Sequence, residues 1–256
     1  METWSRKALK EKAKLRLKAN YWKAVLVGML ALVIGGGSSV ASSASGVTSD
    51  IGTSEISDAA GSAVSHGIGH ISTAEAILIA MFALAFVFIV LVITLAAQIL
   101  LFNPLEIGSN RFFHINLEEN ADIKEVCYAF DRGYKNSVKV MFFRDLYVFL
   151  WSLLFVIPGI IKSYEYRMIP YILGENPDMD KEQVFALSKQ MMDGNKWDTF
   201  VLDLSFFLWD ILGACTLGIL NIFYVEPYRR LTRAGLYQAL KEEQMFVRTE
   251  NITDGQ

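Results

Sequence analysis

Basic residues are absent from a long stretch of the chain, and cysteine is scarce throughout. No Lys or Arg occurs between Lys23 and Arg111, although eight of the 24 basic residues lie in residues 1–23. The two cysteines, Cys127 and Cys215, stand far apart, which argues against a disulfide framework and a paired-cysteine zinc site. A net charge of −3 over 256 residues gives no reason to expect a nucleic-acid partner.

The sequence also lacks the patterns of a soluble enzyme site. It has no glycine-rich phosphate loop, no nucleophile motif and no histidine-containing constellation. His66 and His70 have a spacing that could share a metal ion, but they lack further ligands and lie in a Ser/Gly-rich tract. The sequence therefore predicts no catalytic residue, no cofactor and no metal site, and a protein that is not an enzyme.

Apolar side chains are what the sequence has in excess. Hydrophobic residues make up 53% of the chain, whereas roughly 45 to 50% is usual for soluble domains. Residues 24–40 form one apolar segment, and 77–102 form another that can span a bilayer core of about 30 Å. This composition predicts an all-α integral membrane protein.

The distribution of basic residues predicts the orientation of the chain. Short cytoplasmic loops are rich in Lys and Arg, so we expect the N-terminus inside the cell and the tract without basic residues to cross out and back. The stretch 41–73, rich in Ser and Gly, is expected to be an extracytoplasmic loop. A cleaved signal peptide is the alternative for 24–40, but the long basic region before it favours a retained span.

A proline-glycine pair inside the apolar run FVIPGII predicts a tight reversal at 158–159. Proline cannot continue a helix interior, and glycine accepts the backbone angles of a reversal. We therefore expect one helix over 138–157 and a second over 160–173. The second helix would cover only about 21 Å, so we expect it to be short, tilted or partly inserted.

A second reversal is predicted at 214–218, between helices over 199–213 and from 219 onward. The result is about six transmembrane or hairpin helices in three hairpins, with both termini in the cytoplasm. Four spans are the alternative. That alternative would place the basic residues of 162–199 outside, against the charge bias.

The predicted organisation has five parts, and the three hairpins, each with its preceding helical segment, are expected to be copies of an internal repeat, the second and third offset by about 60 residues. The parts are a basic amphipathic helix at 1–23, a first hairpin at 24–105, a cytoplasmic helix with a second hairpin at 106–177, a cytoplasmic helix with a third hairpin at 178–240, and a tail at 241–256.

The N-terminal helix is predicted to lie on the membrane surface. Ser5 is expected to cap it, and basic residues on such a helix attract anionic lipids of the inner leaflet. Its predicted apolar stripe comprises Trp4, Ala8, Leu15, Ala19 and Trp22. The candidate contacts with anionic lipid are Arg6, Lys7, Lys10, Lys14, Arg16 and Lys18.

Ionisable residues within or beside the predicted spans form a second candidate site. Such groups are costly in a bilayer, so they pair within the protein or line a pathway. We expect Asp203 and Asp210 to share one helix face, with Arg144 or Arg167 as a partner. The candidate network comprises Arg144, Asp145, Lys162, Glu165, Arg167, Asp203, Asp210 and Glu226.

Several segments of the chain resemble the DUF975 family of bacterial integral membrane proteins. They include SRKALKEKAKLRLKANYWKAVLV, NPLEIGSNRFF, FFRDLYVFLWSLLFVIPGIIKSYEYRMIPYILGENPDM, GNKWDTFVLDLSFFLWDILGACTLGI and EPYRRLTRAGLYQAL. The resemblance implies a bacterial plasma membrane and, because the family has no established activity, no catalytic residues. The turn at 228–230 is more basic than the family pattern.

Two classes of function remain. The first is a non-enzymatic multi-pass membrane protein that acts through contacts with lipid, with a protein partner or with a second copy of itself. The second is a small-solute or ion transporter or channel lined by intramembrane acidic residues. Carboxylates that converge on a hydrated cavity would favour transport, whereas closed hairpins with paired charges would favour the first class.

Overall fold

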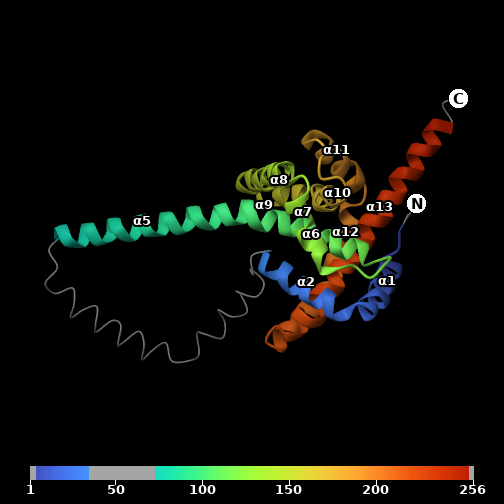
Figure 1. The fold of residues 1–256 in the computed structure, drawn as a ribbon, viewed down its shortest axis with the longest axis horizontal. Helices are drawn as coiled ribbons and strands as arrows, with labels where there is room; N and C mark the ends of the chain where they lie inside the picture. The colour runs from blue at the N-terminus through green and yellow to red at the C-terminus, as the bar shows by residue number, and fades with distance from the viewer. Residues whose placement is uncertain (1–3, 35–72, 254–256) are drawn as a thin grey trace. The chain divides into compact units, whose positions relative to one another are not determined.

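The computed structural model describes residues 4–34 and 73–253, in which every regular element is a helix (Figure 1). The predicted all-α fold is confirmed for these residues. They fall into two units: α5 belongs to one, and α1, α2 and the helices from α6 onward form the other. The bounds are α1 Arg6–Ala19, α2 Tyr21–Ile34, α5 Thr73–Ala97, η1 Gln98–Phe102, α6 Asn103–Ile115, η2 Ile123–Cys127, α7 Tyr128–Asp131, α8 Tyr134–Leu154, α9 Val156–Glu165, α10 Ile169–Glu175, α11 Lys181–Met192, α12 Lys196–Cys215, η3 Asn221–Val225 and α13 Glu226–Thr253.

Helix α5 is apolar along its length, and its described side chains are exposed almost throughout. The helical stretch Ile77–Ile115 contains the one segment among the described residues that is long and apolar enough to cross a membrane. Helix α2 is a shorter apolar helix. The predicted loop up to residue 72, with His66 and His70, lies outside the described residues.

Helix α1 packs along α13, which is drawn in red beside the blue α1 in Figure 1. Its buried face consists of Leu9, Ala13 and Leu17, which recur every four residues and so share one side of the helix. Gly235 of α13 allows the close approach, since a Cβ there would lie 3.3 Å from Leu9 Cδ2. Helix α1 is therefore an integral part of the larger unit.

The predicted apolar stripe of this helix is not the face that packs against α13. Its members Ala8, Leu15, Ala19 and Trp22 are exposed, and Trp4 is half-buried. Ser5 occupies the N-cap position with extended backbone, but its side chain makes no capping hydrogen bond. The helix has apolar residues on more than one face, and packing against α13 selects the face with Leu9.

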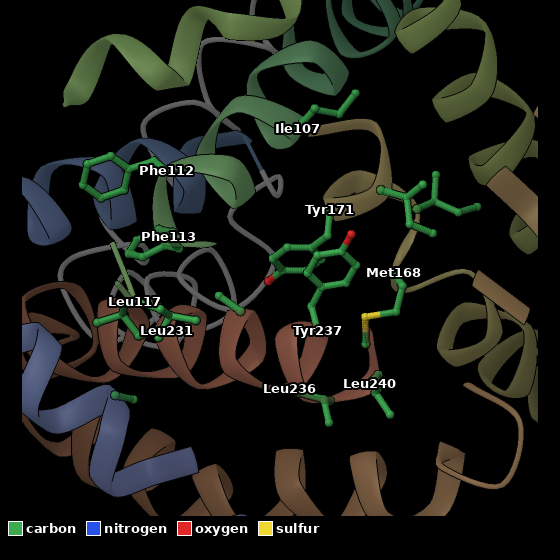
Figure 2. Packing of buried hydrophobic residues seen from close by; sticks show 14 of the residues in the cluster. Ile107, Phe112, Phe113, Leu117, Met168, Tyr171, Leu231, Leu236, Tyr237 and Leu240 are labelled. Atoms are coloured by element: carbon green, nitrogen blue, oxygen red, sulfur yellow. The ribbon is translucent and has the colours of Figure 1, made fainter. Parts of the chain in front are cut away.

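The core of the larger unit is formed where α6, α10 and α13 meet (Figure 2). Pro104 lies just after the π-helical turn η1, so the helical stretch is irregular where the proline N–H is missing. Tyr171 of α10 stacks on Tyr237 of α13, with ring centroids 5.1 Å apart. The side chains around this pair include Ile107, Phe112, Phe113, Met168, Leu231, Leu236 and Leu240.

Helices α8 and α9 form a hairpin, but the reversal is not at 158–159 as predicted. It occurs at Phe155, whose backbone is extended (φ −155°, ψ 141°), between the two helices. Pro158 lies in the first turn of α9, where proline is tolerated, and Gly159 packs closely against Ser152 of α8. The proline-glycine pair therefore starts the returning helix instead of forming the tip.

The predicted continuous helix over 160–173 is also wrong. Helix α9 ends at Glu165, and a separate helix, α10, begins at Ile169 with Pro170 in its first turn. Pro170 lacks the N–H that a continuous helix requires at that position. The segment that follows α6 is divided between the 3₁₀ helix η2 and the short α7.

The second predicted reversal, at 214–218, coincides with a turn in the structure. Helix α12 ends at Cys215, and Leu217 and Gly218 have positive φ angles of 54° and 83°. Glycine accepts this conformation without strain, whereas leucine rarely adopts it. The chain then returns through η3, which packs against α12, and continues into α13.

Candidate functional site

A cleft of about 420 Å³ lies within the larger unit, at the base of the α8–α9 hairpin. Residues of α6, α8, α9, α10 and α13 and of the segment between α9 and α10 line it. They are Glu106, Asn110, Arg144, Asp145, Val148, Phe149, Ser163, Tyr166, Arg167, Pro170, Tyr171 and Arg233. Three arginines and two carboxylates thus face one concave surface.

Arg144 is held in the cleft by two carboxylates. Its Nη1 and Nη2 atoms donate to the two carboxylate oxygens of Glu106, each at 2.9 Å, which is the bidentate geometry typical of strong arginine pairs. Nη2 also lies 2.7 Å from Oδ1 of the adjacent Asp145, whose other oxygen accepts from Asn103 at 3.1 Å. These contacts join α6 to α8 and fix the orientation of the guanidinium.

Asp203 of α12 is shared by two arginines on opposite sides. Arg167 Nη1 lies 2.5 Å from Oδ2, and Arg233 Nη2 lies 3.1 Å from Oδ1. The hydroxyl of Tyr164 also donates to Oδ2 at 3.1 Å. The structure therefore brings Asp203 to Arg167, one of the two partners expected from the sequence, and adds Arg233.

Asp210 does not meet Arg144 or Arg167. It pairs with Arg229 of α13, and its side chain is 42% exposed. Glu226, which is buried, accepts from Arg230 at 2.7 Å. The basic turn at 228–230 therefore supplies the partners of both carboxylates.

Glu165 forms a separate cluster away from the cleft lining. Lys162 lies 2.9 Å from one carboxylate oxygen and Lys196 of α12 lies 3.3 Å from the other. Ser188 of α11 donates its hydroxyl to the backbone oxygen of Glu165 at 2.8 Å. This cluster ties α9 to α11 and α12, so it stabilises the base of the hairpin.

Sequence reasoning did not identify Glu106, Asn110, Tyr171 or Arg233 as site residues. One signal was present, because Glu106 and Asn110 are four residues apart and so share a face of one helix. Asn110 and Tyr171 are 6% and 5% exposed, and neither side chain has a hydrogen-bond partner among the described residues. Tyr171 and Arg233 reach the cleft only through the tertiary fold.

The basic residues of α1 fall into two groups. Lys10 donates to Ser205 Oγ at 2.5 Å, Lys14 lies over the ring of Tyr228, and Arg16 donates to the backbone oxygen of Glu118. Partial burial, with the charges of Lys14 and Arg6 adding to it, lowers the pKa of Lys10.

The other candidate lipid contacts of α1, Arg6, Lys7 and Lys18, are exposed and have no partner within the part of the chain that the structure describes. They are the candidate lipid contacts that packing within the larger unit leaves exposed. The described residues contain no group of three or more His, Cys, Asp or Glu side chains that could hold a metal ion.

A comparison with known protein families gives one match. The family described as a protein of unknown function, DUF975, matches residues 76–244. The chain belongs to the DUF975 family. The match includes every residue of the cleft, whereas α1 and α2 of this DUF975 protein precede it. No curated protein and no solved structure matches the chain.

Proposed function

We propose that this DUF975 protein is a non-enzymatic protein of the bacterial plasma membrane that acts through lipid or protein contacts. The supporting observation is that apolar side chains are exposed at the tips of the α8–α9 and α12–η3 hairpins. The charged residues at the bases of these hairpins are paired. Phe155 is 67% exposed and Leu217 is 78% exposed. Large exposed apolar patches mark membrane or protein interaction surfaces.

The lengths of these hairpins favour insertion into one leaflet. The apolar part of α8, Leu146 to Leu154, is about 14 Å long at 1.5 Å per residue. That is about half of a hydrocarbon core of about 30 Å. We therefore propose that the second and third hairpins enter the membrane and return on the same side, in place of the four further full crossings expected from the sequence.

The first hairpin is proposed to cross the membrane completely. Helix α5 has the length and composition for a span, and α2 is the shorter apolar helix that precedes it in the sequence. The charge bias then places both termini and the base of the larger unit in the cytoplasm. Arg6, Lys7 and Lys18 of α1 would face anionic lipid there, where each basic residue contributes about 1 kcal/mol.

Transport through an acidic pathway is the second candidate function. The cleft beside the Asp203 pairs favours it, because a polar cavity among helices is where solute sites occur. Against it, Asp203, Asp210 and Glu226 each have an arginine partner and none of them lines the cleft. Paired carboxylates favour a structural role for these residues.

The proposal is tested by the accessibility of the hairpin tips in lipid. Single cysteines would replace Phe155, Leu217 and, as an exposed control, Asp178, in a chain with Cys127 and Cys215 changed to Ser. In reconstituted vesicles, we expect an impermeant maleimide to label the outward-facing fraction at position 178 but neither tip. Both tips should react once detergent is added. Full labelling of positions 155 and 217 in intact vesicles would contradict membrane insertion.

A further inference from the structure

The cleft is lined by two mostly buried polar side chains that have no hydrogen-bond partner among the described residues. Asn110 and Tyr171 are each more than nine-tenths buried, both line the cleft, and their side chains have no hydrogen-bond partner among the described residues. The amide of Asn110 and the hydroxyl of Tyr171 are not among the fully buried atoms without a partner, so they keep access to the cleft. Polar atoms that are unpaired within the protein and open to a cavity are available to hydrogen-bond a ligand.

The arginines of the cleft have donors to spare. Arg167 donates to Asp203 through Nη1 only, so its Nε and Nη2 have no partner in the described part of the chain. Arg233 donates to Asp203 through Nε and Nη2, so its Nη1 has no partner there. Because Asp203 holds both guanidiniums, their orientation is set before a ligand arrives. Several N–H groups around one cavity are the arrangement that binds a phosphate group.

The charges around the cleft are balanced, which bears on the charge of the ligand. Arg144, Arg167 and Arg233 are matched by Glu106, Asp145 and Asp203. A simple anion would add an unmatched charge to a partly buried site, which is unfavourable. Asp145 is 42% exposed, so its carboxylate is open to a positively charged group of the same ligand.

The rim of the cleft is apolar on one side. Val148 and Phe149 of α8 line it, and Phe149 begins the exposed apolar surface that continues to the tip at Phe155. We propose that the cleft binds a zwitterionic ammonium-phosphate headgroup, with the phosphate toward Arg167 and Arg233, the ammonium toward Asp145, and an acyl chain along α8. The acyl-chain part rests on the proposed membrane insertion, whereas the headgroup site does not.

The test uses the stacked tyrosines as a matched pair. In Figure 2 their two hydroxyl oxygens lie at opposite ends of the stack, and that of Tyr237 donates to Glu175 at 3.0 Å. Tyr171→Phe removes a hydroxyl without a described partner, so we expect an unchanged melting temperature and a loss of ligand affinity of about tenfold. Tyr237→Phe should do the reverse, lowering the melting temperature and leaving affinity unchanged. Asn110→Ala should behave like Tyr171→Phe.

Affinity would be measured by calorimetric titration of the full chain in uncharged detergent. The probes are dihexanoyl-phosphatidylethanolamine, dihexanoyl-phosphatidylglycerol, soluble phosphoethanolamine and inorganic phosphate. We expect the ethanolamine lipid to bind at least tenfold more tightly than the glycerol lipid. Equal binding of soluble phosphoethanolamine would support the headgroup site and assign a soluble ligand.

Three results would overturn the inference. In the first, no probe binds. In the second, the glycerol lipid binds as tightly as the ethanolamine lipid. In the third, the Tyr171→Phe or Asn110→Ala variant binds the ethanolamine lipid with the affinity of the unaltered protein. Cysteine labelling of the hairpin tips is independent of these titrations. Binding of phosphoethanolamine by a protein whose tips stay labelled in vesicles would therefore reject the proposed membrane insertion and keep the headgroup site.

Discussion

Individual carboxylates organise the larger unit because each pairs with arginine from another part of the chain. Asp203 of α12 accepts from Arg167 and from Arg233 of α13. Glu106 holds Arg144 between α6 and α8. Loss of one carboxylate leaves its guanidinium partners with unmatched charge, which costs more than the pair itself contributes.

Asp203→Asn should therefore destabilise the protein by about 2 kcal/mol or more, since the side chain is mostly buried and has two charged partners. Double-mutant cycles with Arg167→Gln and Arg233→Gln should both be non-additive. The control is Asp210→Asn, because its side chain is 42% exposed and Arg229 keeps a contact with Glu226, so the loss should be no more than about 1 kcal/mol. Thermal or chemical unfolding in detergent measures these changes, and strict additivity in both cycles would contradict the pairing.

Ionisation of Tyr237 is expected to lower the stability of the folded protein at alkaline pH. Burial, with the nearby carboxylate of Glu175 adding to it, raises the pKa of its hydroxyl above the ordinary value of about 10. The folded state thus holds this proton more tightly than the unfolded state, so the stability contribution is complete below about pH 10 and decreases as pH rises above it.

Unfolding measured between pH 7 and 11 checks this expectation. Tyr237→Phe should lose about 1 kcal/mol near neutral pH, because the hydrogen bond to Glu175 is removed. Its free energy of unfolding should then fall less steeply than that of the unaltered protein at alkaline pH. Parallel curves for the two proteins would show that Tyr237 does not titrate as expected.

At the level of residues, the sequence predicted which groups need partners better than it predicted the partners. Asp203 and Arg167 could be matched because each lies in an apolar region where an unpaired charge is costly. Arg229 was not predicted as the partner of Asp210, because it lies beyond the final reversal. Only the packing of η3 and α13 returns the chain to α12.

At the scale of helices, local patterns predicted that elements exist but not which face packs or where a turn falls. The reversal at Phe155 precedes the proline-glycine pair because proline is compatible with the first turn of a helix. The buried face of α1 depends on Gly235, which is distant in sequence. Tertiary contacts decide both features, so neither could be derived from periodicity.

Alanine substitutions at two helical glycines are expected to change the stability of the protein by different amounts. A Cβ on Gly108 of α6 would overlap the backbone carbonyl of Val126, which cannot move without displacing η2. Gly108→Ala should therefore cost about 3 kcal/mol or more through overpacking. A Cβ on Gly235 would meet only the end of the Leu9 side chain, at 3.3 Å.

For Gly235→Ala we expect a change within about 1 kcal/mol, because the higher helix propensity of alanine offsets the tight contact. The two variants are compared by thermal unfolding in the same detergent. A similar loss in both proteins would show that a general effect of removing glycine, and not the contact with Val126, causes the destabilisation of Gly108→Ala.

At the scale of the whole molecule, the proposed topology places the N-terminal helix and α11 on the cytoplasmic side. Gln190 is exposed on α11 and Lys7 is exposed on α1, whereas Ser188 is buried and unsuitable for labelling. Cysteines at Lys7 and Gln190, in a chain without other cysteines, should react with an impermeant maleimide only after cells are permeabilised. Strong labelling at Gln190 on intact cells would favour the alternative of four spans.

The proposed insertion of two hairpins into one leaflet has a mechanical consequence. If Phe155 and Leu217 enter only the cytoplasmic leaflet, these two hairpins add lateral area to that leaflet and none to the other. The hairpins then act as a wedge in the cytoplasmic leaflet. The free energy of the inserted protein is lowest where the cytoplasmic surface is convex, so its distribution along the membrane would follow local curvature as well as lipid composition.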